Sequence, residues 1–294
     1  MIYEIHQVTS YAYGSFVPFA SHVLRLIPLP GPGLEVLECD VVVDPQPSEY
    51  SVAKDFFGNS ITHLSLRSTH KKLSIDSRVV VRLITRDPID PATTPSWELV
   101  RIEAHRTASL AARSPAHQLF ATRHVPIDAD LLAYAEPSFT PGRPILEGAI
   151  DLMQRIYEEF EYDPSATTVR TLARDAFALR RGVCQDFAHV MIGALRSLGL
   201  PAAYVSGYLR TVPRPGAVRL MGADAMHAWV SVWCGREAGW QDLDPTNAVR
   251  AGRDHIPLAF GRDYTDVSPI DGVIYDSGSH SMSVAVDVIE RTAD

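Results

Sequence analysis

The chain has 294 residues, of which 46% are hydrophobic and 21% charged, and its formal net charge at pH 7 is −8. This length suits one large domain or two ordinary ones, and the apolar content can bury a core, which excludes a disordered or fibrous protein. A net negative charge without a block of Lys or Arg also argues against nucleic acid as a partner, because phosphate binding needs concentrated positive charge.

The cysteines and the apolar runs lead to an expectation about the compartment. No apolar run approaches the roughly 20 residues of a membrane span, and the N-terminal segment lacks the pattern of a signal peptide. The three cysteines, Cys39, Cys184 and Cys234, are too few and too widely spaced for a disulfide framework or a paired zinc knuckle. We therefore expect a soluble, cytoplasmic protein that does not bind membranes.

Residues 1–100 are predicted to form a β-rich N-terminal domain. Short alternating or apolar segments occur at residues 2–8, 22–27, 38–43 and 77–84, separated by turn-forming residues. Roughly five to seven short strands in about 90 residues indicate an antiparallel sandwich or barrel. His63 and His70 have no cysteine or carboxylate pair nearby and are interpreted as ordinary structural residues.

The periodicity then changes to that of helices. Residues 98–112 and 128–135 are predicted helices and, with a Pro/Gly-rich stretch at 137–144, make a helical connection over residues 101–144. Residues 145–160 form an amphipathic pattern that marks a helix packed on a core. A catalytic domain is predicted to begin there and to extend over residues 145–294.

Within residues 145–294 we expect helices at 169–179 and 184–198, the second ended by Gly199. Strand-like composition follows at 202–209, 227–233 and 239–244. Residues 272–289 are predicted to form a hairpin with its turn near residues 276–278.

Cys184 is the informative thiol because it stands at the start of a predicted helix, after Gly182 and two arginines. Unpaired N–H groups and the positive end of the helix dipole favour a thiolate there, and the same N–H groups could stabilise an oxyanion. The alternative is a small buried residue that merely opens a helix.

A thiol nucleophile needs a base that is oriented by a third group, and His227 and Asp244 can supply both. His227 begins one predicted strand and Asp244 ends the next, so a hairpin could bring them together. Asp242 lies on the same strand face and competes with Asp244 as the orienting acid. A zinc site made of Cys184, His227 and Asp244 is chemically conceivable, but the helix-start cysteine favours thiol catalysis.

Neighbouring residues have structural interpretations beside functional ones. Asp186 is expected to cap the helix or contact a loop, because a carboxylate beside the thiol would oppose its ionisation. Gln185 could donate to an oxyanion, whereas His189 is expected to be a core histidine. Aromatic residues on strands could line the cleft but belong more often to the core; they are Trp229, Trp233 and Trp240.

The sequence resembles the transglutaminase-like superfamily in several separated motifs. The nucleophile region is GVCQDFA at 182–188, with LRSLGLPA at 195–202 and VSGY at 205–208. HAWV at 227–230 and GW at 239–240 through DPTN at 244–247 resemble the histidine and aspartate motifs. HQVTSYAY at 6–13, HVLRL at 22–26 and GRDY at 261–264 through VSP at 267–269 resemble the bacterial branch.

This resemblance implies an α+β protein. An antiparallel β-sandwich-like N-terminal domain precedes a papain-like or transglutaminase-like core, in which the nucleophile helix packs on an antiparallel sheet. Cys184 would be the nucleophile, His227 the general base and then acid, and Asp244 the orienting carboxylate. No cofactor and no metal are implied.

The implied chemistry is cleavage of a peptide, isopeptide or carboxamide through a thioester. Mammalian-type crosslinkers carry a tryptophan next to the cysteine, where this chain has Gln185, and they are longer; this favours hydrolysis over transfer to an amine. An acyltransferase and a non-catalytic binding or scaffold protein that keeps the triad remain alternatives. Specificity is expected to depend on cleft loops such as residues 211–222, and the oligomeric state stays open.

Overall fold

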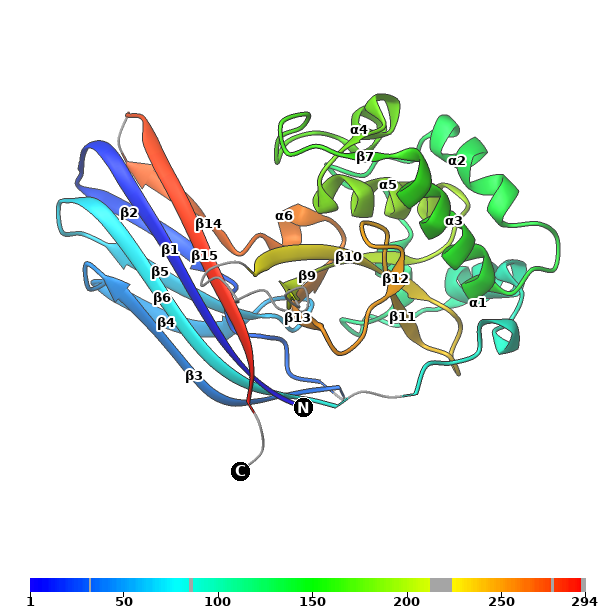
Figure 1. The fold of residues 1–294 in the computed structure, drawn as a ribbon, viewed down its shortest axis with the longest axis horizontal. Coiled ribbons are helices and arrows are strands. Elements are labelled where there is room, and N and C mark those ends of the chain that lie inside the picture. Colours follow the sequence, from blue (N-terminus) through cyan, green and yellow to red (C-terminus); the bar gives the residue numbers. More distant parts are fainter. Residues whose placement is uncertain (32, 85–86, 212–223, 276–277, 292–294) are drawn as a thin grey trace, which may run out of the picture.

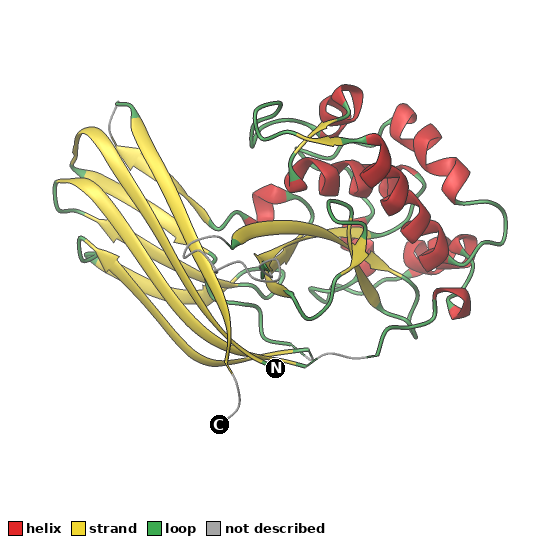
Figure 2. Cartoon of the chain, viewed as in Figure 1, coloured by secondary structure: helices red, strands yellow, loops and turns green. Residues whose placement is uncertain are grey.

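The structure, a computed structural model, describes residues 1–31, 33–84, 87–211, 224–275 and 278–291. Long strands make up one side of the molecule, and all the helices gather on the other side (Figure 2). None of the helices in these residue ranges has the length and apolar character needed to span a membrane.

A sandwich of two four-stranded antiparallel sheets forms the strand-rich side (Figure 1). The sheet orders are β15-β1-β6-β3 and β14-β2-β5-β4. Every second residue of β1 is buried over most of its length, as expected when one face of a strand packs on a core. The strand bounds are β1 (Ile2–Val17), β2 (Phe19–Leu24), β3 (Leu34–Asp44), β4 (Glu49–Lys54), β5 (Ser60–Leu66), β6 (His70–Leu83), β14 (Ile270–Tyr275) and β15 (His280–Arg291).

The C-terminal strands correct two predictions. Residues 272–289 do not form a hairpin, because β14 pairs with β2 in one sheet while β15 pairs with β1 in the other. These strands therefore complete the sandwich, and the catalytic part does not extend over the predicted range 145–294. Local turn composition could not reveal this, since both partners of the strands lie near the N-terminus, as the adjacent blue and red strands in Figure 1 show.

The helical side packs on a five-stranded antiparallel sheet of order β12-β11-β10-β9-β13. Its strands are β9 (Ala202–Leu209), β10 (Ala225–Trp233), β11 (Trp240–Asp244), β12 (Val249–Arg250) and β13 (His255–Gly261). A short parallel pair joins β7 (Glu161–Tyr162) to β8 (Arg181–Gly182). The helices are α1 (Trp97–Arg106), α2 (Ala129–Ala135), α3 (Ile145–Glu159), α4 (Ala173–Leu179), α5 (Cys184–Ser197) and α6 (Tyr264–Val267), with short 3-10 helices at Pro91–Thr93, Pro115–Gln118 and Glu136–Ser138.

Helix α5 is the centre of this core. Every residue from Gln185 to Arg196 is buried, because α5 packs on β9 and β10 and is flanked by α2, α3 and α4 (Figure 1). Gly199, which follows the helix, has a φ of 79° and accepts the left-handed conformation that ends a helix. The predicted stop at Gly199 is confirmed.

The sandwich and the helical part share buried contacts. Tyr3 and Ile5 of β1 belong to the same apolar cluster as Tyr208 of β9 and Ile256 of β13. The hydroxyl of Tyr208 also donates to Oε1 of Gln7 at 2.8 Å, in a buried position. The sheet that carries the candidate site is thus fixed against the N-terminal strands.

Candidate active site

Cys184 is the first residue of α5, and its side chain is half-buried. It follows β8, whose Gly182 pairs with Tyr162 of β7. The first N–H groups of a helix have no partner within the helix, so the thiol stands where a negative charge is favoured. The predicted position of this cysteine at a helix start is confirmed.

Asp186 holds the beginning of α5 in place. Its Oδ2 accepts the backbone N–H of Val183 at 2.8 Å and the hydroxyl of Thr167 at 2.6 Å. Burial raises the pKa of the Asp186 carboxyl, although these two hydrogen bonds act in the opposite direction. The residue has the capping and loop-anchoring contacts predicted for it.

Gly182 leaves room for this arrangement, and replacing it with alanine is expected to disturb the start of α5. An added Cβ would lie 2.5 Å from Oδ2 of Asp186, so the carboxylate would have to move. We expect a loss of about 1–3 kcal/mol in the free energy of unfolding, with slower alkylation of Cys184. Thermal unfolding and the rate of reaction with iodoacetamide measure the two effects.

Gly31→Ala is the matched control, because no atom lies within 4 Å of its added Cβ. If Gly182→Ala unfolds and reacts like the wild type, the proposed steric constraint is wrong.

His227 and Asp244 meet through the pairing of their strands. β10 and β11 are antiparallel neighbours, and Nε2 of His227 lies 2.8 Å from Oδ2 of Asp244. Both side chains are buried. Because Nε2 faces the carboxylate, the other ring nitrogen is left for the thiol of Cys184.

The two partners of His227 raise its pKa. Burial by itself lowers that pKa, but the hydrogen bonds and negative charges of Asp244 and Cys184 outweigh it and raise the pKa to about 10. The imidazole is therefore a strong proton acceptor between a thiol and a carboxylate.

Asp244 accepts hydrogen bonds on both of its oxygens. Oδ1 accepts the backbone N–H groups of Thr246 at 2.9 Å and Asn247 at 3.3 Å, while Oδ2 accepts the side-chain amide of Asn247 at 2.7 Å. A second histidine, His255 of β13, lies with Nε2 at 3.0 Å from Oδ2. Burial favours the protonated acid, but these donors together hold the pKa of Asp244 well below its usual range.

The competing aspartate has a different partner. Oδ2 of Asp242 accepts the indole N–H of Trp229 at 3.2 Å, and Trp229 is fully buried. Among the described residues, Asp244 is thus the carboxylate bonded to His227. The sequence could not choose between the two by alternation, and the motif at 244–247 indicated the residue that the structure pairs with the histidine.

The other predicted neighbours have structural contacts. The amide of Gln185 donates to the carbonyl of Val169 at 3.2 Å. His189 is buried, accepts the N–H of Tyr264 at 3.1 Å and has a pKa lowered to about 3 by burial, as a core histidine would. Trp233 is buried in the helical core, whereas Trp240 is only partly buried. Residues 212–222 of the predicted cleft loop lie outside the described residues.

The remaining thiols lie in other surroundings. Cys234 is buried, and burial raises its pKa to about 12. Cys39 is exposed on β3, and desolvation of its sulfur together with the charge of Asp40 raises its pKa.

Sequence reasoning missed His255 and the role of Asn247. The segment from Asp244 to Asn247 has the composition of a turn, and this could have suggested that the two side chains are in contact. His255 opens an apolar strand eleven positions after Asp244. No local signal links the two residues.

The site could be considered for a metal, because ligand atoms of His227, Asp244 and His255 lie within 4.8 Å of one another. The hydrogen bonds argue against this assignment. The N–H of Gly252 donates to Nδ1 of His255 at 3.4 Å, so the proton of a neutral His255 is on Nε2. That nitrogen then donates to Asp244 and has no lone pair for a cation.

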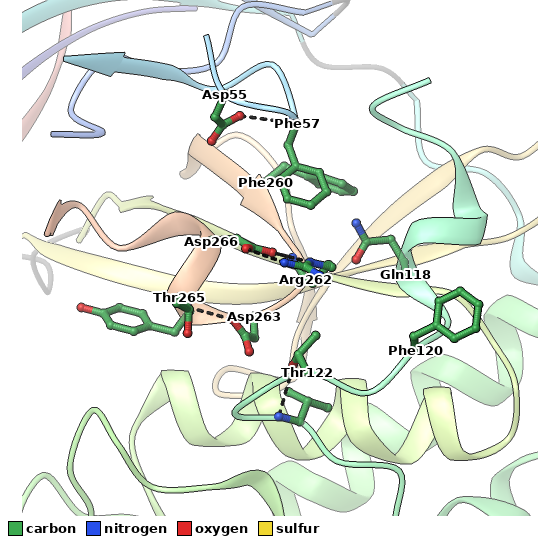
Figure 3. Close-up of polar contacts among 12 residues, drawn as sticks. Asp55, Phe57, Gln118, Phe120, Thr122, Phe260, Arg262, Asp263, Thr265 and Asp266 are labelled. Carbon is green, nitrogen blue, oxygen red and sulfur yellow. Dashed lines mark hydrogen bonds and ion pairs between the residues drawn. The ribbon is translucent and has the colours of Figure 1, made fainter. Parts of the chain in front are cut away.

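A separate cavity of about 550 Å³ lies between the sandwich and the helical part, and its lining includes none of the three predicted catalytic residues. Figure 3 shows Arg262 and Asp266, two of the residues that line it, paired below Phe57. This ion pair has an N to O distance of 2.8 Å, and Arg25 lies 3.6 Å from Asp55. The arginine and aspartate side chains that line this cavity are thus paired with one another.

A cysteine at the start of a buried helix, followed by a histidine and an aspartate on adjacent antiparallel strands, is the arrangement of papain-like and transglutaminase-like thiol proteins. Residues 3–82 match the family model of the bacterial transglutaminase-like N-terminal region, and residues 133–245 match that of the transglutaminase-like superfamily. The chain belongs to the transglutaminase-like superfamily, whose members are typically enzymes.

Relatives and a solved structure are similar to this chain. An uncharacterized protein of Mycobacterium tuberculosis is 38% identical over 86% of this chain and 82% of its own length. A protein-glutamine gamma-glutamyltransferase of Pseudomonas aeruginosa is 26% identical over 74% of this chain but only 31% of its own length. A proposed cysteine protease from Cytophaga hutchinsonii shares the fold, with a TM-score of 0.77 and 21% identity over 100% of this chain and 92% of that one.

Proposed function

We propose that this protein is a thiol-dependent amide hydrolase that acts on peptide or isopeptide bonds. Cys184 is the nucleophile, His227 the general base and then acid, and Asp244 the carboxylate that orients the imidazole. The observation that carries this proposal is the 2.8 Å contact between His227 and Asp244 beside the thiol of Cys184. A nucleophile, a base and an orienting group in this order are the requirements of covalent catalysis.

The reaction follows from the positions of these groups. Sγ of Cys184, whose proton His227 has taken, attacks the carbonyl carbon, and first-turn N–H groups of α5 stabilise the oxyanion. The C–N bond then breaks as His227 returns the proton to the leaving amine, which leaves a thioester on Cys184. Water attacks the thioester with His227 as base, and the acid is released with the thiol restored.

An acyltransferase is the second candidate, because the same thioester can react with an amine in place of water. The similarity to the Pseudomonas aeruginosa protein-glutamine gamma-glutamyltransferase supports this alternative. Gln185, which stands where the mammalian-type crosslinkers have tryptophan, supports water as the acceptor.

Selective alkylation of Cys184 is the expected result of a first test. Iodoacetamide should label Cys184 at least about tenfold faster than Cys39 or Cys234, because Cys184 alone has an activating histidine neighbour among the residues that the structure describes. Mass spectrometry of tryptic peptides over time measures the three rates in one sample. Equal, slow labelling of all three thiols would contradict the catalytic proposal.

A panel of peptides and isopeptides, offered to the wild type and to Cys184→Ala, then tests the reaction itself. Hydrolysis gives a free acid, whereas transfer joins the acyl group to a fluorescent primary amine; either reaction releases the amine of the cleaved bond, or ammonia where that bond is a primary carboxamide. Amine incorporation that outcompetes water would favour the acyltransferase. If no amide is turned over although Cys184 is selectively reactive, the result would favour a non-catalytic binding or scaffold protein that keeps the triad.

A further inference from the structure

His255 reaches Asp244 from β13, the edge strand that follows β10 and β9 in the sheet order. It is the first residue of β13, it is buried, and its Nε2 lies 3.0 Å from the same Oδ2 atom that His227 contacts. The centroids of the two imidazole rings are 6.1 Å apart. The two histidines therefore flank a single carboxylate oxygen.

The hydrogen bonds of His255 define the roles of its two ring nitrogens. Its Nδ1 accepts the N–H of Gly252 at 3.4 Å, which leaves Nε2 as the ring nitrogen that donates to Asp244. Among the described residues, the titratable groups that face this ring are Asp244 and His227; the ring of Trp229 lies nearly perpendicular to it, with the two centroids 5.3 Å apart. Next to it in the chain, Asp254 is paired with Arg210 at 2.8 Å.

His255 completes the set of side-chain donors on Oδ2. His227 and Asn247 supply the other two, and Asn247 lies on the turn directly after Asp244. His255 thus anchors the carboxylate to β13, whereas the backbone donors on Oδ1 belong to the same turn as Asp244. Without His255, all the remaining donors to the Asp244 carboxylate except His227 belong to the turn at 244–247 and would move together with it.

We propose that His255 is a positioning residue that holds the carboxylate of Asp244 in line with His227. The inference rests on the proposed function, since His255 acts on the reaction only through Asp244 and His227. Partners that orient catalytic or ligating groups typically contribute 10–100-fold to activity, about the effect expected here.

Two substitutions separate the hydrogen bond from packing. His255→Leu fills space but donates nothing, and we expect kcat to fall about 10–100-fold. His255→Gln places an amide N–H near the position of Nε2, and we expect kcat to recover to within about threefold of wild type. His22→Leu, which removes a buried histidine from the sandwich, controls for the loss of an imidazole elsewhere.

Nuclear magnetic resonance titration of His227 gives a readout that needs no substrate. If the carboxylate swings away in His255→Leu, the pKa of His227 falls toward its ordinary value, while His255→Gln keeps it high. A pKa in His255→Leu equal to or above that of the wild type would overturn the proposal. So would a His255→Gln variant that folds normally but is as impaired as His255→Leu, because packing would then be the cause.

Failure of the proposed function would look different. In that case Cys184 of the wild type would react no faster than Cys39, whereas the His227 titration would still report whether His255 positions Asp244. A selectively reactive Cys184 together with an unchanged His227 titration in His255→Leu would reject the positioning role alone.

Discussion

Replacing Asp244 with asparagine is expected to lower kcat by about 10³–10⁴-fold, as loss of the orienting carboxylate does in other triads. Five donors converge on the two oxygens of Asp244, but an asparagine amide has only one oxygen. Either orientation of the amide sets an N–H group against another donor. If the amide N–H faces Nε2 of His227, it forces the proton onto the nitrogen that should receive it from Cys184.

The pH profile of the same variant tests the role of His227. In the wild type we expect kcat to fall as the pH rises through about 10, because His227 then loses the proton that the leaving amine needs. In Asp244→Asn this alkaline limb should move down toward the ordinary histidine pKa of about 6.5. Steady-state measurements of kcat between pH 5 and 11 locate the alkaline limb of the wild type and that of Asp244→Asn.

Asp242→Asn is the control for this experiment. It lies on the same strand, and its substituted amide oxygen can still accept the indole N–H of Trp229. We expect kcat within about threefold of wild type. If the two variants lose activity equally, Asp244 does not have a special role.

Replacing Arg196 with methionine is expected to lower the free energy of unfolding by about 3–5 kcal/mol, the largest stability effect that we predict. The guanidinium of this α5 residue is fully buried and donates to carbonyl groups of three chain segments that meet at the end of the helix. Its acceptors are the carbonyls of Gln118, Phe120, Ala202 and Arg262 and the side chain of Gln118. Methionine fills the space but leaves these buried acceptors unsatisfied.

Urea unfolding of Arg196→Met and of Arg236→Met measures this difference. The side chain of Arg236 is 80% exposed and pairs with Glu103, so its loss should cost less than about 1 kcal/mol. A midpoint for Arg196→Met that equals that of Arg236→Met would show that the buried network contributes nothing.

The local sequence was sufficient to predict the helix and the strands that carry Cys184, His227 and Asp244. The start of α5 at Cys184, its end before Gly199 and the strands β9 to β11 follow from capping residues, apolar period and strand composition. The contact of His227 with Asp244 could also be anticipated, because consecutive strands joined by a short turn are usually antiparallel neighbours. These features depend on residues close together in the chain.

Tertiary structure decided the rest. The C-terminal strands pair with the first strands of the chain, which no local pattern encodes. β11 and β13 are separated by two strands, so a flat sheet would place them about 14 Å apart. The 3.0 Å contact between Nε2 of His255 and Oδ2 of Asp244 therefore depends on the three-dimensional shape of the sheet and on the reach of both side chains. Sequence alone determined which residues could do chemistry and that His227 and Asp244 could meet, whereas the long-range packing of the sheets brought His255 to the same carboxylate.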